Sequence, residues 1–315
     1  MDFIENSVCE CIILKPRLSA FGNSLSYCDF DLCGKKVLDW VKECVSQYNV
    51  TEIECEENLK SEVSFIQPFL KNAKYTIVIY ANMPLVYTDT INNLVKYTNL
   101  KDLTIAKSGK INIYKTEYIK NNIPISNDFQ EVGEADLVQF TQCKDYDSYC
   151  KICKIMQSNI IENHLSKGVK IENPFSVVID ANSHLGQNVT IKSNCVLLNA
   201  NIDNDSIVGE NCILKNAFIG KNVEIKQGNI IEKTKINDNC FIDVKNTIIN
   251  SVIDSNSRCV NSKIENSRID KNCIIKDFCI ISSTFLGANI ECGEYVRMTE
   301  RKLKEGAKIN PFCNL

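Results

Sequence analysis

The sequence predicts an α/β layer with parallel strands, followed by a parallel β-helix of hexapeptide repeats. Two observations lead to this prediction. In the first half of the chain, an apolar run precedes an amphipathic helical segment twice. In the second half, an aliphatic residue returns at about every sixth position, and the whole pattern repeats every 16 or 17 residues. An α-helix would show apolar residues at spacings of three and four instead.

One aliphatic residue marks the start of each repeat. These residues are Leu185, Ile202, Ile219, Ile236, Ile253, Ile269 and Leu286. From Ile202 and again from Ile219, the apolar steps are six, six and five residues, which fits three short strands and three bends per coil. Because a coil cannot bury its own apolar edge, its stacked neighbours must supply the core. We expect seven full coils between residues 179 and 309.

Two other positions of the repeat support the same coil. Four places after an aliphatic residue stands a small side chain that we expect to point inward: Cys195, Cys212, Val223, Cys240, Ser257, Cys273 and Cys279. Three places after the repeat-starting residues stand Asn188, Asp205, Asn222, Asn239, Asn256, Asn272 and Asn289. Because Asn and Asp tolerate a left-handed backbone, we interpret this column as a turn ladder at one corner. A polar binding stripe is the alternative.

The first half contains the elements of the α/β layer. Residues 9–14 and 75–80 are apolar runs that predict buried strands. Residues 34–45 and 88–97 predict helices, the second with Thr88 or Asp89 near its N-cap. Short strands are expected over residues 101–119.

A third helix is predicted over residues 143–166, with Ile152, Ile155, Ile160 and Ile161 as its apolar members. It leads into Gly168 and the first repeat. We therefore expect an α/β domain over residues 1–142, a helical linker over 143–167 and the β-helix over 168–315.

Composition excludes several classes of protein. The net charge is -3 with acids and bases interspersed, and no apolar run approaches the roughly 20 residues of a membrane-spanning helix. We therefore expect no nucleic-acid partner and no membrane partner. The first residues lack the features of a signal peptide, so the 17 cysteines are expected to be reduced thiols in the cytoplasm. Cys150 and Cys153 form a CxxC pair, but a structural zinc site normally has a second pair, and no metal site is predicted.

Several segments together resemble one family. Residues 156–174 hold His164, Leu165, Gly168, Val169 and Pro174. These match the junction of the bifunctional N-acetylglucosamine-1-phosphate uridyltransferase/glucosamine-1-phosphate acetyltransferase family. The segments 32–41, 78–86 and 131–140 are similar to further family motifs in the same order. The resemblance implies a Rossmann-like nucleotidyltransferase domain followed by a left-handed β-helix, and an activity of the UDP-N-acetylglucosamine diphosphorylase type.

The chain departs from that family at its catalytic motifs. The glycine-rich loop after the first strand is replaced by a segment that begins Lys15-Pro16-Arg17 and retains only Gly22. A metal-binding aspartate of the family corresponds to Asn82, and a neutral amide is a poor Mg²⁺ ligand. A second metal-binding position corresponds to Ala135, although Asp136 beside it is kept.

These departures favour a catalytically degenerate member that acts as a binding or assembly module. The alternative is an active sugar-1-phosphate nucleotidyltransferase with a remodelled site, in which Lys15, Arg17 and Lys35 are the residual catalytic candidates. Asn82 and Asp136 are the candidate substrate-binding residues. No cofactor is predicted unless the chain is active, in which case the resemblance implies Mg²⁺. A nucleotide or a sugar phosphate is the expected small-molecule partner.

Acetyl transfer is the least favoured activity. It would need a general-base histidine with partners in hydrogen-bond reach, and the repeats contain only His184. A basic cluster of Arg297, Arg301, Lys302 and Lys304 near the last turn is interpreted as a solvated cap, with an anion site as the alternative.

We also expect a homotrimer with the β-helices side by side. Outward aromatic residues on flat faces favour association, and the resembling family assembles in this way. These residues are Phe218, Phe241, Phe278 and Phe285.

Overall fold

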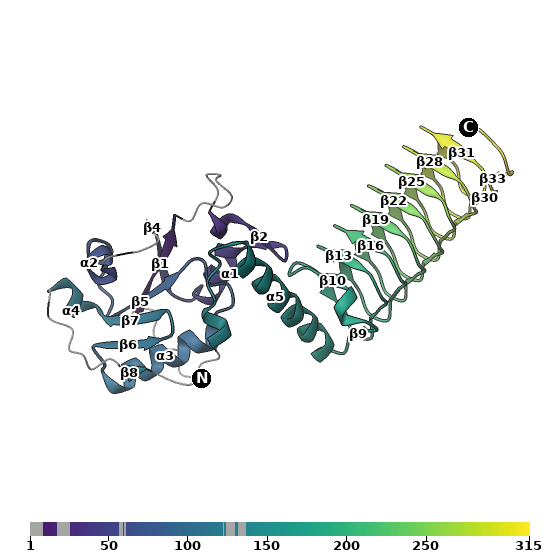
Figure 1. Ribbon diagram of the computed structural model, residues 1–315. Helices are drawn as coiled ribbons and strands as arrows, with labels where there is room; N and C mark the ends of the chain where they lie inside the picture. The colour runs from purple at the N-terminus through teal and green to yellow at the C-terminus, as the bar shows by residue number, and fades with distance from the viewer. Residues whose placement is uncertain are drawn as a thin grey trace. The chain divides into compact units, whose positions relative to one another are not determined.

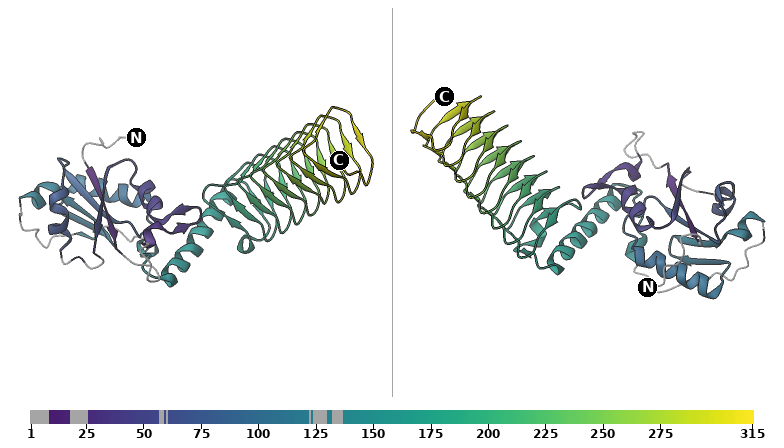
Figure 2. Two further views of the ribbon diagram at one scale, coloured as in Figure 1. Left: turned by 90° about the horizontal axis from the view of Figure 1, so that it is seen from above. Right: turned by 180° about the vertical axis from the view of Figure 1, so that it is seen from behind.

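The computed structural model describes residues 9–17, 26–56, 59, 61–121, 123, 130–131 and 137–315 (Figures 1 and 2). Contacts divide the chain into a first unit, Met1–Met156, and a second unit, Gln157–Leu315. The division falls inside a single helix, α5 (Tyr146–Ser166), the helix expected over residues 143–166. None of the described helices is long and apolar enough to span a lipid bilayer.

The first unit contains a six-stranded sheet in the order β4-β1-β5-β7-β6-β8. Its strands are β1 (Cys9–Pro16), β4 (Asn49–Cys55), β5 (Tyr75–Tyr80), β6 (Ile105–Ser108), β7 (Ile111–Lys115) and β8 (Gln130–Glu131). β1 runs parallel to both β4 and β5, as the two strand-then-helix segments predicted, whereas β7 is antiparallel to β5 and β6.

Helices cover both faces of this sheet. Alternate strand residues point to opposite sides, and both sets include apolar residues in β1 and β5, so each face packs against helices. Ile13 and Ile77 lie in a core cluster with Leu38 of α1 (Val37–Cys44) and Ile91 of α3 (Thr88–Lys101). The neighbouring residues Ile12 and Val78 lie in a second cluster, which also holds residues of α2 (Glu62–Ile66) and α4 (Thr116–Lys120). Short 3-10 helices occur at Tyr27–Asp29, Gln67–Phe69, Leu137–Phe140 and Pro174–Ser176.

Several sequence-based boundaries in this unit were wrong. The first helix begins at Val37, because the preceding residues form a hairpin of β2 (Asp31–Leu32) and β3 (Lys35–Lys36). The helix expected over residues 88–97 has Thr88 and Asp89 directly after its N-cap, Tyr87, as predicted, but it continues to Lys101. The segment 101–119 contains β6 and β7 as expected, but its end forms α4, which the sequence did not predict.

The second unit is a parallel β-solenoid whose coils stack in chain order (Figure 1). We name its sheets the first, second and third face. The first face contains β10 (Val178–Ile179), β13 (Val196–Leu198), β16 (Ile213–Lys215), β19 (Ile230–Glu232), β22 (Thr247–Ile249), β25 (Lys263–Glu265), β28 (Ile280–Ser282) and β31 (Arg297–Thr299).

The second face contains β11 (His184–Leu185), β14 (Asn201–Ile202), β17 (Phe218–Ile219), β20 (Lys235–Ile236), β23 (Val252–Ile253), β26 (Arg268–Ile269), β29 (Phe285–Leu286) and β32 (Lys302–Leu303). The third face contains β9 (Lys170–Ile171), β12 (Thr190–Ile191), β15 (Ile207–Val208), β18 (Glu224–Ile225), β21 (Phe241–Ile242), β24 (Arg258–Cys259), β27 (Ile274–Ile275), β30 (Glu291–Cys292) and β33 (Lys308–Ile309).

The predicted aliphatic column is confirmed. On the second face, Ile219 pairs with Ile236 and Ile236 pairs with Ile253, so the repeat-starting residues stack directly. All three side chains lie in one apolar core, together with the predicted small residues such as Cys195 and Cys212. Burying one aliphatic residue per face in every coil gives the unit a continuous core.

The corner ladder is also confirmed. Each of its seven members has a left-handed backbone, with φ between 53° and 61°: Asn188, Asp205, Asn222, Asn239, Asn256, Asn272 and Asn289. The side chains bond from coil to coil, as Asn222 Nδ2 donates to Asn239 Oδ1 at 2.9 Å. The other two corners have similar left-handed columns, which the sequence analysis did not identify.

The expected count of seven coils was too small, since the solenoid has about eight turns and begins at Lys170. Lys170 pairs with Thr190, a separation of 20 residues rather than 17. The 3-10 helix Pro174–Ser176 lies in this longer interval. The first coil therefore breaks the period by which the others were recognised.

Candidate functional site

The carboxyl ends of β1 and β5 form a candidate ligand site in the first unit. Of the three parallel strands, β1 is central, and its neighbours β4 and β5 lie on opposite sides of it. In open α/β sheets, ligands bind outside the carboxyl ends of the strands where the strand order reverses in this way. The backbone N–H of Ala81, directly after β5, donates to Leu14 O at 2.8 Å and holds the two strand ends together.

Two of the three cationic candidates lie at the end of β1, and each has an acidic partner. Lys15 Nζ lies 3.3 Å from Asp29 Oδ1, and both side chains are about three-quarters buried, with 24% and 26% exposed. Arg17 lies 3.1 Å from Glu54, but both of these side chains are well exposed. Such an exposed pair contributes at most about 1 kcal/mol. The Lys15 ammonium is therefore the more firmly held of the two.

Lys35 is placed elsewhere, on the β2–β3 hairpin. Its Nζ bonds Glu43 of α1 at 2.5 Å and lies 4.7 Å from the centre of the Trp40 ring. Lys15, Arg17 and Lys35 are each paired with a different carboxylate, and Lys35 lies on a different element from the other two.

Asn82 is buried and ties the end of β5 to the segment before α5. Its Nδ2 donates to Cys143 O at 3.2 Å, and its Oδ1 accepts from Gln142 Nε2 at 3.4 Å. Its backbone oxygen also accepts the N–H of Cys143 at 2.7 Å. Burial raises the pKa of the Cys143 thiol to about 12, so the thiol beside these backbone contacts is uncharged. The side chain of Asn82 thus has a structural task that leaves little capacity for a ligand.

Mg²⁺ does not fit the described part of this site. At nucleotide sites Mg²⁺ is usually held by one or two carboxylates together with waters and substrate phosphates. No group of three or more histidine, cysteine or carboxylate side chains that could hold a metal ion occurs among the described residues. Asp29 and Glu54 are already paired with cations, and the Asn82 amide is engaged. Asp136, Ala135 and Gly22 lie outside the described residues.

A carboxylate that the sequence analysis missed lies beside the end of β5. Glu62 accepts from Tyr80 Oη at 3.1 Å, Tyr114 Oη at 2.8 Å and Asn112 Nδ2 at 2.7 Å. Burial, followed by the Glu62 charge, raises the pKa of both Tyr80 and Tyr114, so they remain protonated donors. The partners come from α2, β5 and β7 with no common motif, which explains why no sequence signal identified them.

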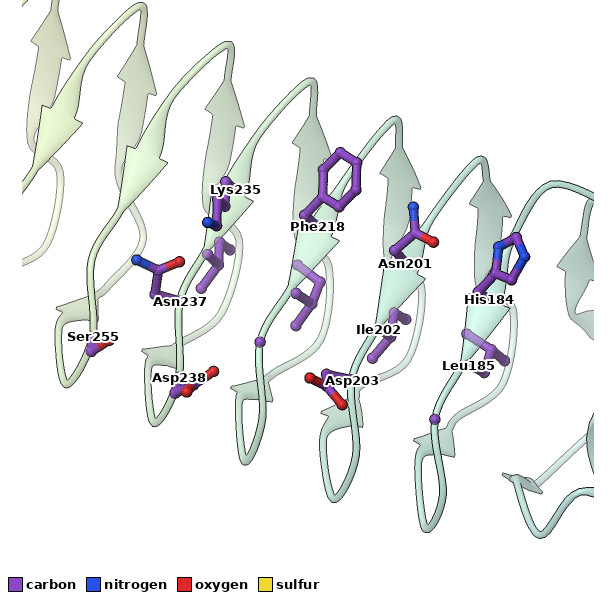
Figure 3. Close-up of a pocket in the computed structure, with 14 residues that line it drawn as sticks. His184, Leu185, Asn201, Ile202, Asp203, Phe218, Lys235, Asn237, Asp238 and Ser255 are labelled. Carbon is purple, nitrogen blue, oxygen red and sulfur yellow. The ribbon is translucent and has the colours of Figure 1, made fainter.

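The second unit has a shallow groove of about 700 Å³ on its second face (Figure 3). His184, Asn201, Phe218 and Lys235 form its outward column, one residue per coil. The exposed His184 ring contacts Asn182 O through Nδ1 at 3.0 Å. Among the described residues, no carboxylate is bonded to this ring, so the partner that a general base would need is absent there.

Three of the four outward phenylalanines lie on flat faces as expected, and the fourth stands at a corner. Phe218 and Phe285 lie on the second face, Phe241 lies on the third face, and Phe278 stands at a corner with φ 60°. Phe278 stacks on Tyr295 at 4.9 Å instead of packing on a flat sheet. The hexapeptide step places residues on different faces according to their offset from the aliphatic column. Phe218 and Phe285 directly precede repeat-starting residues, whereas Phe241 and Phe278 have other offsets.

The CxxC pair lies on α5. Cys150 and Cys153 are half-buried free thiols, and Cys33 Sγ lies 4.0 Å from Cys153 O. Burial raises the pKa of the Cys153 thiol, which disfavours the thiolate that zinc or a redox reaction requires.

No protein-family model matches the sequence, and no curated protein matches it. Solved structures with some similarity include a CMP:2-keto-3-deoxy-manno-octonic acid synthetase complexed with CTP. It has 12% identity and a TM-score of 0.36, and the match covers 48% of this chain and 99% of that chain. Another is the Francisella novicida UDP-N-acetylglucosamine acyltransferase, with 18% identity and a TM-score of 0.32, covering 47% of this chain and 54% of that one.

The chain spans about half the length of that acyltransferase. Likenesses at these identities and scores give no functional conclusion. The fold assignment, a Rossmann-like α/β unit followed by a parallel β-solenoid, rests on the sheet order and register of the chain itself.

Proposed function

We propose that this chain is a binding or assembly module on a sugar-phosphate nucleotidyltransferase type of scaffold, and that it does not catalyse nucleotidyl transfer. The observation that supports this most directly is the engagement of Asn82. The side chain at the position where the resembling family has a metal ligand is buried and bonded to the 142–143 segment.

The argument against catalysis is electrostatic. Nucleotidyl transfer depends on cations and donors positioned around the reacting phosphates. Lys15 is neutralised by Asp29 in a largely buried pair, and Lys35 by Glu43. A phosphate that recruited Lys15 would leave Asp29 without its partner in a poorly solvated place, which costs free energy.

A nucleotide or sugar phosphate remains the proposed small-molecule partner, bound at the carboxyl ends of β1 and β5. Arg17 is the residue best suited to hold its phosphate, because its pairing with Glu54 is exposed and weak. The weak pairing of Arg17 also favours the second candidate function, an active nucleotidyltransferase with a remodelled site. In that case Arg17 would act beside Lys15 at the strand end.

A calorimetric titration of the full chain with UTP, UDP-N-acetylglucosamine and acetyl-CoA, each with and without Mg²⁺, tests the proposal. We expect binding of a nucleotide or nucleotide sugar that does not require Mg²⁺ and weakens in Arg17→Ala. Lys36→Ala, which removes an exposed charge from the β2–β3 hairpin, is the matched control. Pyrophosphate release from UTP and N-acetylglucosamine-1-phosphate, if it depends on Mg²⁺ and on Arg17, would establish the enzyme instead.

We further propose that three copies assemble side by side through the solenoid. The first face supports this better than the phenylalanines do, because its outward column is aliphatic in four successive coils: Val178, Val196, Ile213 and Ile230. Flat apolar surfaces of this kind mark association sites. Light scattering should give about three times the chain mass of 35.6 kDa, and Ile213→Glu should lower it. A mass of one chain contradicts the trimer.

A further inference from the structure

A second groove on the solenoid is lined by cations and contains no carboxylate. It has a volume of about 680 Å³ and follows the corner between the first and second faces from Asn216 to Arg301. Its charged lining residues are Lys233, Lys235, Arg268 and Arg301, and Phe218 and Phe285 stand near its ends. All of these residues lie in the continuously described part of the chain.

Three of these four cations have no ion-pair partner. Arg268 lies 3.2 Å from Asp270, whereas no described carboxylate lies within ion-pairing distance of Lys233, Lys235 or Arg301. Several cations on or beside the third face of the same solenoid are paired with carboxylates. There Arg258 bonds Asp243 at 2.8 Å, and Lys276 bonds Glu291 at 2.8 Å. Lys233 and Lys235 lie in one coil, Arg268 lies two coils later and Arg301 four coils later, so the groove presents a row of cations with no carboxylate in its lining.

Lys233 stands at a corner position with a left-handed backbone. Its φ is 48°, and the preceding and following coils have Asn216 and Asn250 there. Similar φ values occur at other corner residues, such as Lys245 and Ser283, so this conformation belongs to the repeat. Lys233 is relevant to the groove through its charge and its place in the lining.

The outward column beside the groove alternates apolar and cationic side chains, coil by coil. In order, it contains Phe218, Lys235, Val252, Arg268, Phe285 and Lys302. Neighbouring strands lie about 4.8 Å apart, so each kind of side chain recurs about every 10 Å. An extended polyproline II segment places every third residue on the same side at intervals of about 9.3 Å, which matches this spacing.

Nucleic acid fits the column less well. Single strands are held by aromatic rings that stack on successive bases. Here the two phenylalanines are four coils apart, roughly 19 Å at the strand spacing, and aliphatic Val252 lies midway between them. A chain that alternates acidic and apolar side chains matches this surface, whereas a uniformly charged phosphate backbone does not.

We propose that this groove is the docking site for an acidic segment of a partner polypeptide, bound in an extended conformation. Carboxylates of the segment pair with Lys233, Lys235, Arg268 and Arg301, and its apolar residues contact Phe218 and Phe285. Five coil steps give a groove of about 24 Å, which accommodates about eight residues of such a segment. The proposal deepens the function as a binding module, but it does not depend on the site in the first unit.

The test uses fluorescence anisotropy with the full chain and a labelled peptide of four Glu-Leu-Pro repeats. A Lys-Leu-Pro peptide is the charge control, and a labelled 12-nucleotide oligothymidylate probes nucleic acid. We expect the acidic peptide to bind and the basic one not to bind. Affinity should fall about tenfold or more in Lys235→Glu/Arg301→Glu, and also when salt is raised.

Lys221→Glu/Lys271→Glu is the matched control, because it makes the same change in charge at exposed residues outside the groove lining. This variant should bind the peptide nearly as the wild type does. Equal binding by both double variants, no binding of the acidic peptide, or tighter binding of the oligonucleotide would each overturn the proposal. The nucleotide titration at the first unit is unaffected by these substitutions, so failure of one proposal can be distinguished from failure of the other.

Discussion

The two units of this chain differ in what covers their strands. In the first unit, helices cover both faces of the sheet, and several polar groups are buried and bonded inside the fold. Glu10 is an example, since its carboxylate accepts the Lys71 N–H at 3.0 Å and the Thr76 hydroxyl at 2.9 Å. The solenoid also buries polar side chains, such as Asn246, whose Nδ2 donates to Asn229 Oδ1 at 3.1 Å, but its strands carry outward as well as lumenal side chains.

This difference shows where new binding surfaces can arise in each unit. In the first unit, changing a buried polar residue disturbs the fold, because its partner then loses a hydrogen bond. In the solenoid, the lumenal side chains form the core that stabilises the fold. The outward side chains can therefore differ from coil to coil with little effect on stability. The cation-lined groove has no carboxylate in its lining, whereas on the third face Arg258 is paired with Asp243. These are two different sets of outward side chains over the same apolar core.

The largest expected effect tests the division between lumen and surface. Ile275 is fully buried in the lumen, whereas its neighbour Ile274 is 42% exposed on the third face. Ile275→Asp places an unpaired charge in the apolar core and should destabilise the solenoid by about 4 kcal/mol or more. Ile274→Asp is the matched control and should change the free energy of unfolding by less than about 0.5 kcal/mol. Circular dichroism melting of both variants measures the contrast, and similar melting temperatures would contradict it.

The next effect tests the buried polar groups of the first unit. Asn82→Ala removes the donor to Cys143 O and should cost about 1–3 kcal/mol of stability. Asn93→Ala, an exposed position on α3, should change stability by no more than about 0.5 kcal/mol. Denaturant unfolding measures both variants. If Asn82→Ala unfolds like the wild type but changes nucleotide binding, Asn82 is a ligand-binding residue and not a structural one.

Most of the solenoid could be predicted from sequence because its contacts repeat. Each aliphatic residue touches its counterpart one coil later, so a fixed period reveals the core. The first coil was missed because its interval is 20 residues long. The strand β4 was missed because it is an edge strand whose outward residues are polar, so no apolar run marks it.

The candidate site of the first unit could be predicted only in part. The apolar runs located β1 and β5, and Lys15 and Arg17 were placed at the end of β1. Their pairing with Asp29 and Glu54 could not be predicted, because ion pairs between distant segments follow no sequence period. The Glu62 cluster was missed for the same reason.

A third prediction concerns the pH dependence of the second unit. His164 is buried near the end of α5, and its Nδ1 has no hydrogen-bond partner among the residues that the structure describes. Burial, with smaller contributions from the charges of Lys167 and His184, lowers the pKa of His164 below its usual 6.5. Below about pH 6.5 the unfolded chain therefore binds a proton more readily than the folded chain, and stability falls as the pH falls. Each unit by which the pKa is lowered corresponds to about 1.4 kcal/mol.

Melting temperatures between pH 7.5 and 5.5 should decrease in the wild type, and His164→Phe should flatten this slope because it removes the titrating group without adding a polar one. His184→Asn, at the exposed histidine, should keep most of the slope. An identical slope in His164→Phe would assign the effect to other groups.

The smallest expected effect concerns the corners of the solenoid, where the backbone conformation of the substituted residue should determine the change in stability. Lys245 has φ 55° in a corner column where Gly228 precedes it and Asn261 follows it. Lys245→Asn should stabilise the solenoid by up to about 1 kcal/mol, because asparagine adopts the left-handed conformation with less strain. The new amide would also extend a side-chain ladder of the kind in which Asn194 bonds Asn211 at 3.3 Å. Lys215→Asn is the control, since Lys215 lies in β16 and has no left-handed backbone to relieve. Denaturant midpoints should rise for the first variant and stay level or fall for the second. If the denaturant midpoints of both variants fall, the Lys245 side chain stabilises the solenoid by more than the strain of its left-handed backbone costs.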